Sequence, residues 1–174
     1  PGIDYVEADL PDMAWRKQRL LARQGALGER HRVETVNILV ADGDHSVAAL
    51  LRRLDPARPV AVITEGLINY FDLATISPFW ARLARALKAF PRGVYLTDNY
   101  PLYANMRFHR TLKTLGGLLG ALSRSNVAFH FDSDRATKAH FHEQGFAALT
   151  VLRFSSSTGR LGGKYFTPCS CYYS

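Results

Sequence analysis

The sequence predicts an α/β protein in which a mostly parallel sheet is covered by helices on both faces. Two observations predict this class. Short runs rich in β-branched residues alternate with amphipathic helical segments along the chain of 174 residues. The run at 36–41 is almost continuously apolar, as expected of a parallel strand that is buried on both faces. We expect residues 1–174 to form a single domain, because no internal repeat or clear linker is visible.

Composition excludes several other classes of protein. Hydrophobic residues make up 47% and charged residues 21% of the chain, which is typical of a globular protein. The longest charge-free stretches, such as 114–123, have ten residues, whereas a membrane-spanning helix needs about 20. The two cysteines, Cys169 and Cys171, cannot build a disulfide framework. No secretory signal is visible, so we expect a soluble, cytoplasmic protein with no membrane partner.

Boundary residues predict where the helices and strands of the first part of the chain begin and end. Pro11 suits the first turn of a helix, and Gly25 ends that helix. The turn at 42–44 follows the apolar run, and Ser46 is an N-cap for the next helix. The expected elements are therefore strands at 3–8 and 36–41 and helices at 11–24 and 47–54.

The second part continues the alternation. Pro59 introduces a strand at 60–64, and a helix follows at 73–90 that can be interrupted at Pro78. We expect the tail at 155–174 to be irregular, although its aromatic residues allow it to pack. The remaining expected elements are strands at 93–97, 127–131 and 147–154, an amphipathic segment at 102–122 and a helix at 134–144.

Four successive expected strands are each followed by an acid. These acids are Asp9, Asp42, Glu65 and Asp98. In parallel α/β folds, ligands bind at the carboxyl ends of the strands, so the acids indicate a binding edge. The alternative, that they only stabilise the N-termini of the following helices, stays open at this point.

Two segments carry a resemblance to a known family. They are YVEADLP at 5–11, followed by Lys17, and PVAVITEGLINYF at 59–71. Together they resemble the leucine carboxyl methyltransferase family, which includes polyketide O-methyltransferases of the tetracenomycin type. The resemblance runs from residue 3 to residue 71 and weakens beyond Asp98. It implies the Rossmann-like sandwich of class I methyltransferases that use S-adenosylmethionine (SAM).

The resemblance also implies a cofactor site. Asp9 accepts hydrogen bonds from the ribose hydroxyls of SAM, and Asp42 binds the adenine amino group with Gly43 near the ring. Glu65 lines the pocket near the methionine end or the ribose, and Gly66 allows a sharp turn there. Glu7, which alternates with Asp9 along the strand, is expected to support the site indirectly.

The implied reaction is methyl transfer to a hydroxyl or carboxyl oxygen of a small, polyketide-like molecule or to a carboxyl terminus. The resemblance places Asn69 and Tyr70 at the entrance to the substrate pocket, with Asp98 nearby. A carboxylate acceptor needs no base, whereas a phenol acceptor can need one. The sequence does not single out one catalytic residue for that role. The candidate bases are His109, His130, His140 and His142. We expect no metal site.

Two other functions remain open. Family members normally begin with a first strand and a glycine-rich loop, and no Gly-x-Gly pattern precedes residue 3. We therefore expect an N-terminally incomplete domain, which could be a non-catalytic fragment or interaction module, could form a homo-oligomer, or could associate with the missing segment. The net charge of +7 raises the option of a nucleic-acid binder. Its basic residues are spread along helical segments, which favours solvated helix faces instead.

Overall fold

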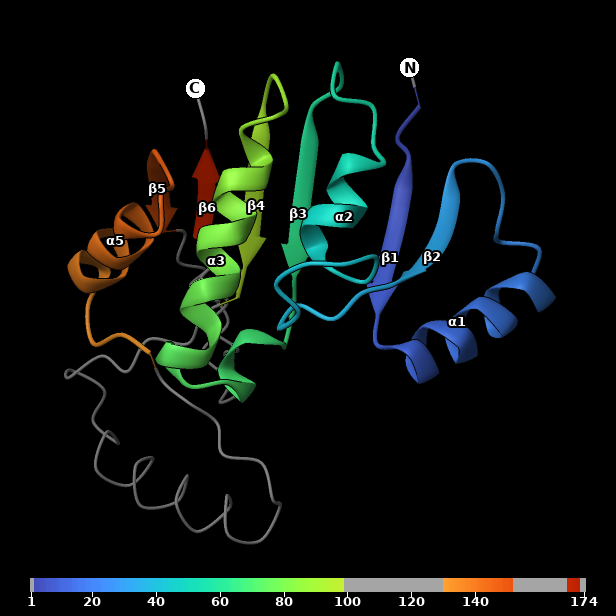
Figure 1. Ribbon diagram of the computed structural model, residues 1–174, viewed down its shortest axis with the longest axis horizontal. Coiled ribbons are helices and arrows are strands. Elements are labelled where there is room, and N and C mark those ends of the chain that lie inside the picture. Colours follow the sequence, from blue (N-terminus) through green and yellow to red (C-terminus); the bar gives the residue numbers. More distant parts are fainter. Residues whose placement is uncertain (1, 99–129, 152–168, 173–174) are drawn as a thin grey trace, which may run out of the picture. The chain divides into compact units, whose positions relative to one another are not determined.

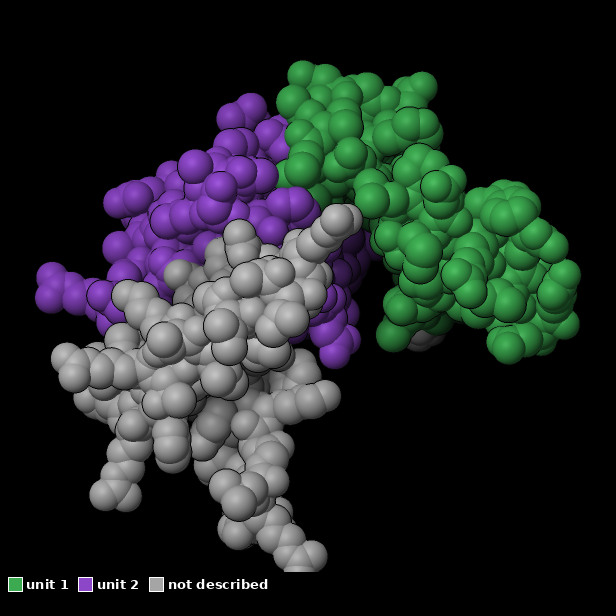
Figure 2. All heavy atoms as spheres, turned by 90° about the horizontal axis from the view of Figure 1, so that it is seen from below, with its two compact units in different colours: residues 1–55 green, residues 56–174 purple. Residues whose placement is uncertain are grey.

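The computed structural model describes residues 2–98, 130–151 and 169–172. These residues belong to two compact units, residues 1–55 and residues 56–174, which are coloured separately in Figure 2. No helix in the described ranges is long and apolar enough to cross a membrane.

The first unit is built around a parallel pair of strands. β1 (Tyr5–Asp9) pairs with β2 (His31–Thr35), and the register runs from Tyr5 opposite His31 to Asp9 opposite Thr35. The connection between them contains α1 (Pro11–Arg23), which begins at the predicted proline. After β2 comes α2 (Val47–Arg52), and its predicted N-cap, Ser46, accepts a hydrogen bond from the N–H of Ala49 at 3.1 Å.

The expected strand at 36–41 is wrong. The strand of this region is β2, and the apolar run that follows it is a loop in which Leu39 and Val40 are 44% and 37% exposed. Asn37 holds the loop, because its N–H donates to the His45 carbonyl and its Oδ1 accepts from the N–H of Leu39. A side chain that bonds to nearby backbone in this way competes with strand pairing.

The first unit buries few large side chains. Its buried apolar residues are Ala14, Val36, Ala49 and Leu51. Trp15 of α1 is 59% exposed, and the Arg19 guanidinium lies 4.5 Å from the centre of a Trp15 ring. Large apolar side chains that remain exposed in this unit are Ile3, Tyr5, Leu10, Met13, Trp15, Leu20, Leu39 and Val40.

The second unit contains a four-stranded sheet with the order β3-β4-β6-β5 (Figure 1). β3 and β4 are parallel, and β6 is antiparallel to both of its neighbours, β4 and β5. β6 lies inside the tail at 155–174, so part of the tail expected to be irregular forms a strand. The bounds are β3 (Val60–Thr64), η1 (Ile68–Tyr70), α3 (Leu73–Leu87), β4 (Gly93–Thr97), α5 (Asp134–Glu143), β5 (Ala148–Val151) and β6 (Cys169–Tyr172).

Several expectations for this unit are confirmed. Strands β3 and β4 have the expected bounds, and α5 ends one residue earlier than expected. α3 ends at Leu87 and runs through Pro78 without interruption. The amphipathic segment at 102–122 lies outside the described residues, as do most of the expected strand at 127–131 and the end of the one at 147–154.

An aromatic cluster around Trp80 forms the core of the second unit. Trp80 of α3 is fully buried, and its ring centre lies 4.6 Å from that of Phe141 in α5. Its indole N–H donates to Tyr95 Oη of β4 at 3.3 Å. These contacts hold α3, which crosses the front of the sheet in Figure 1, against both β4 and α5. Other buried apolar residues of this core include Ile76, Phe79, Leu83, Leu87, Phe131 and Phe146.

The close approach of β4 to α3 gives a first prediction. A Cβ added at Gly93 would lie 2.8 Å from the Cβ and 2.9 Å from the carbonyl oxygen of Leu87. We expect Gly93→Ala to destabilise the second unit by about 1–3 kcal/mol, because the backbone must move to relieve the overlap. Urea unfolding followed by tryptophan fluorescence in a Trp15→Phe background, where Trp80 is the remaining tryptophan, measures the effect. Gly28→Ala, where a Cβ meets nothing within 4 Å, is the control and should change little.

Candidate cofactor site

Asp9 lies at the carboxyl end of β1, as the sequence predicts. Its carbonyl oxygen accepts from the N–H of Val36 at 2.8 Å, which continues the pairing of β1 with β2 by one bond. Its carboxylate oxygen Oδ1 accepts from the N–H of Leu10 at 2.9 Å. A carboxylate has about four acceptor positions, so this bond leaves capacity for a ligand hydroxyl.

Asp42 does not follow a strand directly, which corrects the expectation. It lies with Gly43 in the exposed loop between β2 and α2. Gly43 has φ 91°, a conformation that favours glycine. Its carbonyl accepts from both the N–H and the hydroxyl of Ser46, at 3.0 and 2.8 Å. The loop that carries Asp42 is thereby tied to the start of α2.

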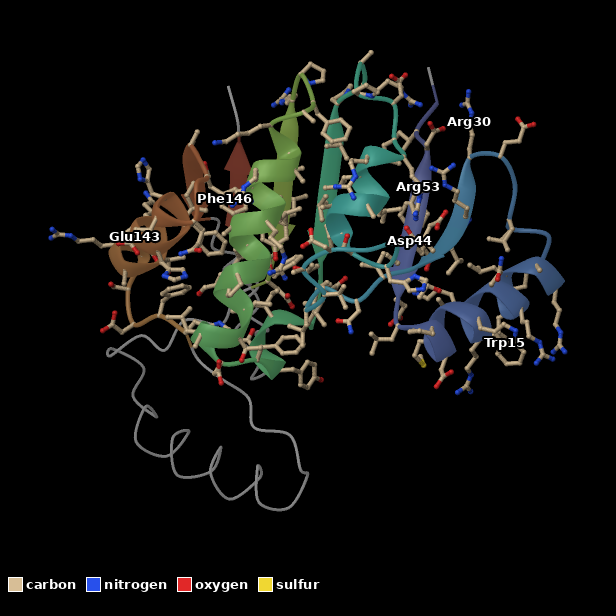
Figure 3. The ribbon with its side chains drawn as sticks, viewed as in Figure 1. Trp15, Arg30, Asp44, Arg53, Glu143 and Phe146 are labelled. Carbon is tan, nitrogen blue, oxygen red and sulfur yellow. The ribbon has the colours of Figure 1, made fainter. Side chains whose placement is uncertain are left out.

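Arg53 ties the same loop to β2. Its guanidinium Nη2 donates to Glu34 Oε2 of β2 at 2.9 Å, and Nη1 reaches the Asp44 carbonyl at 3.5 Å. Arg53 and Asp44 are both labelled in Figure 3. Because Asp44 is two residues from Asp42, these contacts also restrain the position of Asp42, which is predicted to bind the adenine amino group.

Glu7 joins three elements of the first unit. Its carboxylate contacts Lys17 Nζ of α1 at 2.9 Å and His31 Nε2 of β2 at 2.7 Å. The other ring nitrogen of His31 contacts the Ala26 carbonyl at 2.9 Å. The hydrogen bonds from Lys17 and His31 lower the pKa of Glu7.

Glu65, Gly66 and Asp98 come together at the ends of β3 and β4 in the second unit. The N–H of Gly66 donates to both carboxylate oxygens of Asp98, at 3.0 and 2.8 Å. Asp98 is 7% exposed, and burial, with the Glu65 charge as a smaller cause, raises its pKa. Just before these residues, Thr64 Oγ1 donates to Thr97 Oγ1 at 2.9 Å.

Two of the three predicted pocket residues, Asn69 and Tyr70, are neighbours in the chain that differ in exposure. Tyr70, in η1, is 62% exposed, whereas its neighbour Asn69 is 9% exposed. Only Tyr70 is therefore available in this structure to contact a molecule from solvent.

The candidate histidines lie in different surroundings. His130 Nε2 donates to the Phe71 carbonyl at 2.7 Å, and its Nδ1 is buried with no hydrogen-bond partner among the described residues. His140 Nε2 contacts Ser77 Oγ at 2.9 Å. Burial lowers the pKa of both imidazoles. His142 is exposed, and His109 lies outside the described residues.

The predicted site residues are divided between the two units. Asp9, Asp42 and Gly43 belong to the first, and Glu65 and Gly66 to the second. The sequence reasoning missed Thr64 and Thr97, which are register partners at the ends of their strands. A signal was present, since both strands end in threonine followed by an acid. Within the described ranges, no group of three His, Cys, Asp or Glu side chains could hold a metal ion.

The fold is that of class I methyltransferases, as comparison with solved structures shows. PigF with SAH has a TM-score of 0.59 at 17% identity, and the match covers 99% of this chain and 43% of that one. Magnesium protoporphyrin IX methyltransferase (ChlM) from Synechocystis PCC 6803 with bound SAH has a TM-score of 0.56 at 15% identity, covering 97% and 64%. An O-methyltransferase family protein from Burkholderia thailandensis has a TM-score of 0.56 at 16% identity, covering 95% and 42%.

The first part of the chain matches a family model. Residues 1–82 match the family model of leucine carboxyl methyltransferase, which confirms the resemblance carried by the two motifs. No curated protein matches the chain. The chain spans less than two thirds of each solved structure named above.

The contacts of Glu7 give a second prediction. Because its pKa is lowered below 4.5 in the folded chain, its contribution to stability is present above pH 4.5 and is lost as the pH falls through the folded value. We expect Glu7→Gln to lower the free energy of unfolding by about 0.5–1 kcal/mol at pH 7 and to remove this acid dependence. Hydrogen exchange of the β1 amides, followed as a function of pH, measures this change in the free energy of unfolding. Glu29→Gln, an exposed acid in the same unit, should leave the exchange unchanged.

The buried histidines give a third prediction. Their pKa values are lowered below 6.5 in the folded chain, so the unfolded chain binds protons first and the second unit loses stability as the pH falls below 6.5. His140→Gln should weaken this dependence, and the exposed His142→Gln in the same helix should not. Urea midpoints between pH 7.5 and pH 5, from tryptophan fluorescence in the same Trp15→Phe background, measure both variants. Equal slopes for the two variants would contradict the prediction.

Proposed function

We propose that this chain carries part of the SAM site of an O-methyltransferase that modifies a hydroxyl or carboxyl oxygen of a small molecule or a carboxyl terminus. The observation that carries the proposal is the match of residues 1–82 to the leucine carboxyl methyltransferase family, which includes both acid-bearing motifs. The bound SAH in the PigF and ChlM structures supports the class of cofactor.

Asp9, Asp42 and Gly43 are proposed to contact the adenosine part of SAM. Asp9 accepts from the ribose hydroxyls, since a carboxylate has only acceptors and can take both. Asp42 accepts from the adenine amino group, with the backbone of Gly43 beside the ring. The residues fit such a group, because a Cβ at Gly43 would meet nothing within 4 Å and Asp42 is exposed.

Glu65 and Gly66 are proposed to contact the methionine part of SAM. Glu65 is exposed, and its negative charge suits a sulfonium and an ammonium group. The space around Gly66 is open, since a Cβ there would also meet nothing within 4 Å. Exposed Tyr70 contacts the acceptor substrate. Asn69 and Asp98 are buried, so we assign them to the support of the pocket rather than to its lining.

The proposed chemistry asks the protein mainly for alignment. When bound, SAM supplies a methyl group that its sulfonium already activates. The side chains of this chain therefore have to hold the two reactants in line and exclude competing orientations. A carboxylate acceptor needs no base. For a hydroxyl acceptor, His130 and His140 are the described candidates whose lowered pKa values keep them neutral, and thus able to accept a proton, at pH 7.

The edge of the described sheet and the composition of the chain suggest partners and a location. β3 is an edge strand of the described sheet. Because an edge strand presents backbone N–H and C=O groups for pairing, this favours association through the β3 edge with a further strand, from a second copy or from another segment. Sedimentation equilibrium separates the two, since only self-association depends on the concentration of this chain. We place the protein in the cytoplasm on its composition and assign it no nucleic-acid role.

Cofactor binding is the fourth prediction. We expect the chain to bind SAM and SAH in calorimetric titration, and Asp9→Ala to weaken binding by roughly tenfold or more, because hydrogen bonds to a charged acceptor are lost. Asp42→Ala should weaken it less, since Asp42 is more exposed.

The matched control is Asp44→Ala, which removes an exposed acid from the same loop as Asp42. Its binding should equal that of the parent chain. Absence of binding by the parent, or binding that Asp9→Ala does not weaken, would overturn the proposed function and favour a non-catalytic module.

A further inference from the structure

Two polar contacts join the ends of β3 and β4 on either side of Glu65. Before Glu65, the Thr64 hydroxyl donates to Thr97 Oγ1 at 2.9 Å. After Glu65, the Gly66 N–H donates to the two Asp98 oxygens at 3.0 and 2.8 Å. The backbone of Glu65 is therefore held at the residue before it and at the residue after it.

The first contact is anchored in the core. Tyr95 Oη lies 2.7 Å from Thr64 Oγ1, and the Trp80 indole N–H donates to Tyr95 Oη at 3.3 Å. Trp80 and Tyr95 are both fully buried. A buried chain of hydrogen bonds fixes one arrangement, because any other arrangement leaves polar atoms unpaired. Thr64 thus has a fixed position relative to the aromatic cluster.

The second contact holds a turn with an unusual backbone. Gly66 has φ 61°, in the left-handed region. The buried carboxylate of Asp98 is costly to desolvate, and the N–H of Gly66 offsets part of that cost. The desolvation cost of the Asp98 carboxylate and the backbone conformation at Gly66 are therefore linked.

The geometry points to Asp98 as a positioning residue that fixes the Glu65–Gly66 turn so that the Glu65 carboxylate is presented to the cationic end of SAM. The inference rests on the proposed function and deepens it. It gives Asp98 a role other than contact with the substrate, since Asp98 is 7% exposed and both of its carboxylate oxygens face the Gly66 N–H.

A pH profile distinguishes this role from a merely structural one. The pKa of Asp98 is raised by burial and by the charge of Glu65, which is the charged group acting on it among the described residues. Asp98 therefore takes up a proton at a higher pH than an ordinary aspartate, and its bond from Gly66 weakens. We expect the affinity for SAM to fall as the pH is lowered, and Asp98→Asn to flatten that dependence.

The experiment uses the 174-residue chain with SAM itself as the probe. Calorimetry and hydrogen exchange of the Gly66 amide are measured for the parent, Asp98→Ala, Asp98→Asn and the exposed control Asp132→Ala. We expect Asp98→Ala to weaken SAM binding roughly tenfold and to speed exchange at Gly66. Asp98→Asn, which keeps an acceptor oxygen, should restore much of both at pH 7, and Asp132→Ala should match the parent.

The outcomes separate the inference from the proposed function. If the parent binds SAM and Asp98→Ala binds it equally well despite faster exchange at Gly66, the inference is overturned and the proposed function stands. If the parent does not bind SAM, both fall. If Asp98→Ala does not fold, the pH profile of Asp98→Asn decides, and a profile that follows the parent overturns the inference.

Discussion

The burial of Trp80 is the interaction on which the second unit depends. Its ring contacts His130, Phe131, His140 and Phe141, while its N–H reaches Tyr95. One side chain therefore joins α3, α5, β4 and the segment before α5. Because an indole without a partner for its N–H is costly to bury, the apolar packing and the polar chain toward Thr64 constrain each other.

The first unit uses a different balance of forces. Its buried apolar side chains are few, and charged contacts connect its elements instead, through Glu7 on one side and Glu34 on the other. Partly exposed ion pairs contribute little each, and a two-stranded sheet is marginal on its own. The part of the chain that holds Asp9 and Asp42 therefore has a small apolar core, whereas the part that holds Glu65 has a large aromatic one.

The helices and strands that the sequence predicted best are those defined by residues within them or next to them. Pro59, Gly93 and the β-branched run between Val60 and Thr64 defined their strands to the residue. Asp9 was placed well because it ends such a strand, whereas Asp42 was misplaced because β2 is rich in charged residues and the apolar run comes after it. The bond between Asp98 and Gly66 could not be predicted, since it depends on the register of strands that are distant in sequence.

The place of β6 has a consequence for the order of assembly. β6, at residues 169–172, lies between β4 and β5, and it is the last described strand in the chain. During synthesis, β4 and β5 leave the ribosome without the strand that joins them. The four-stranded sheet can therefore be completed only after residues 169–172 have emerged, whereas the pairing of β1 with β2 does not depend on them.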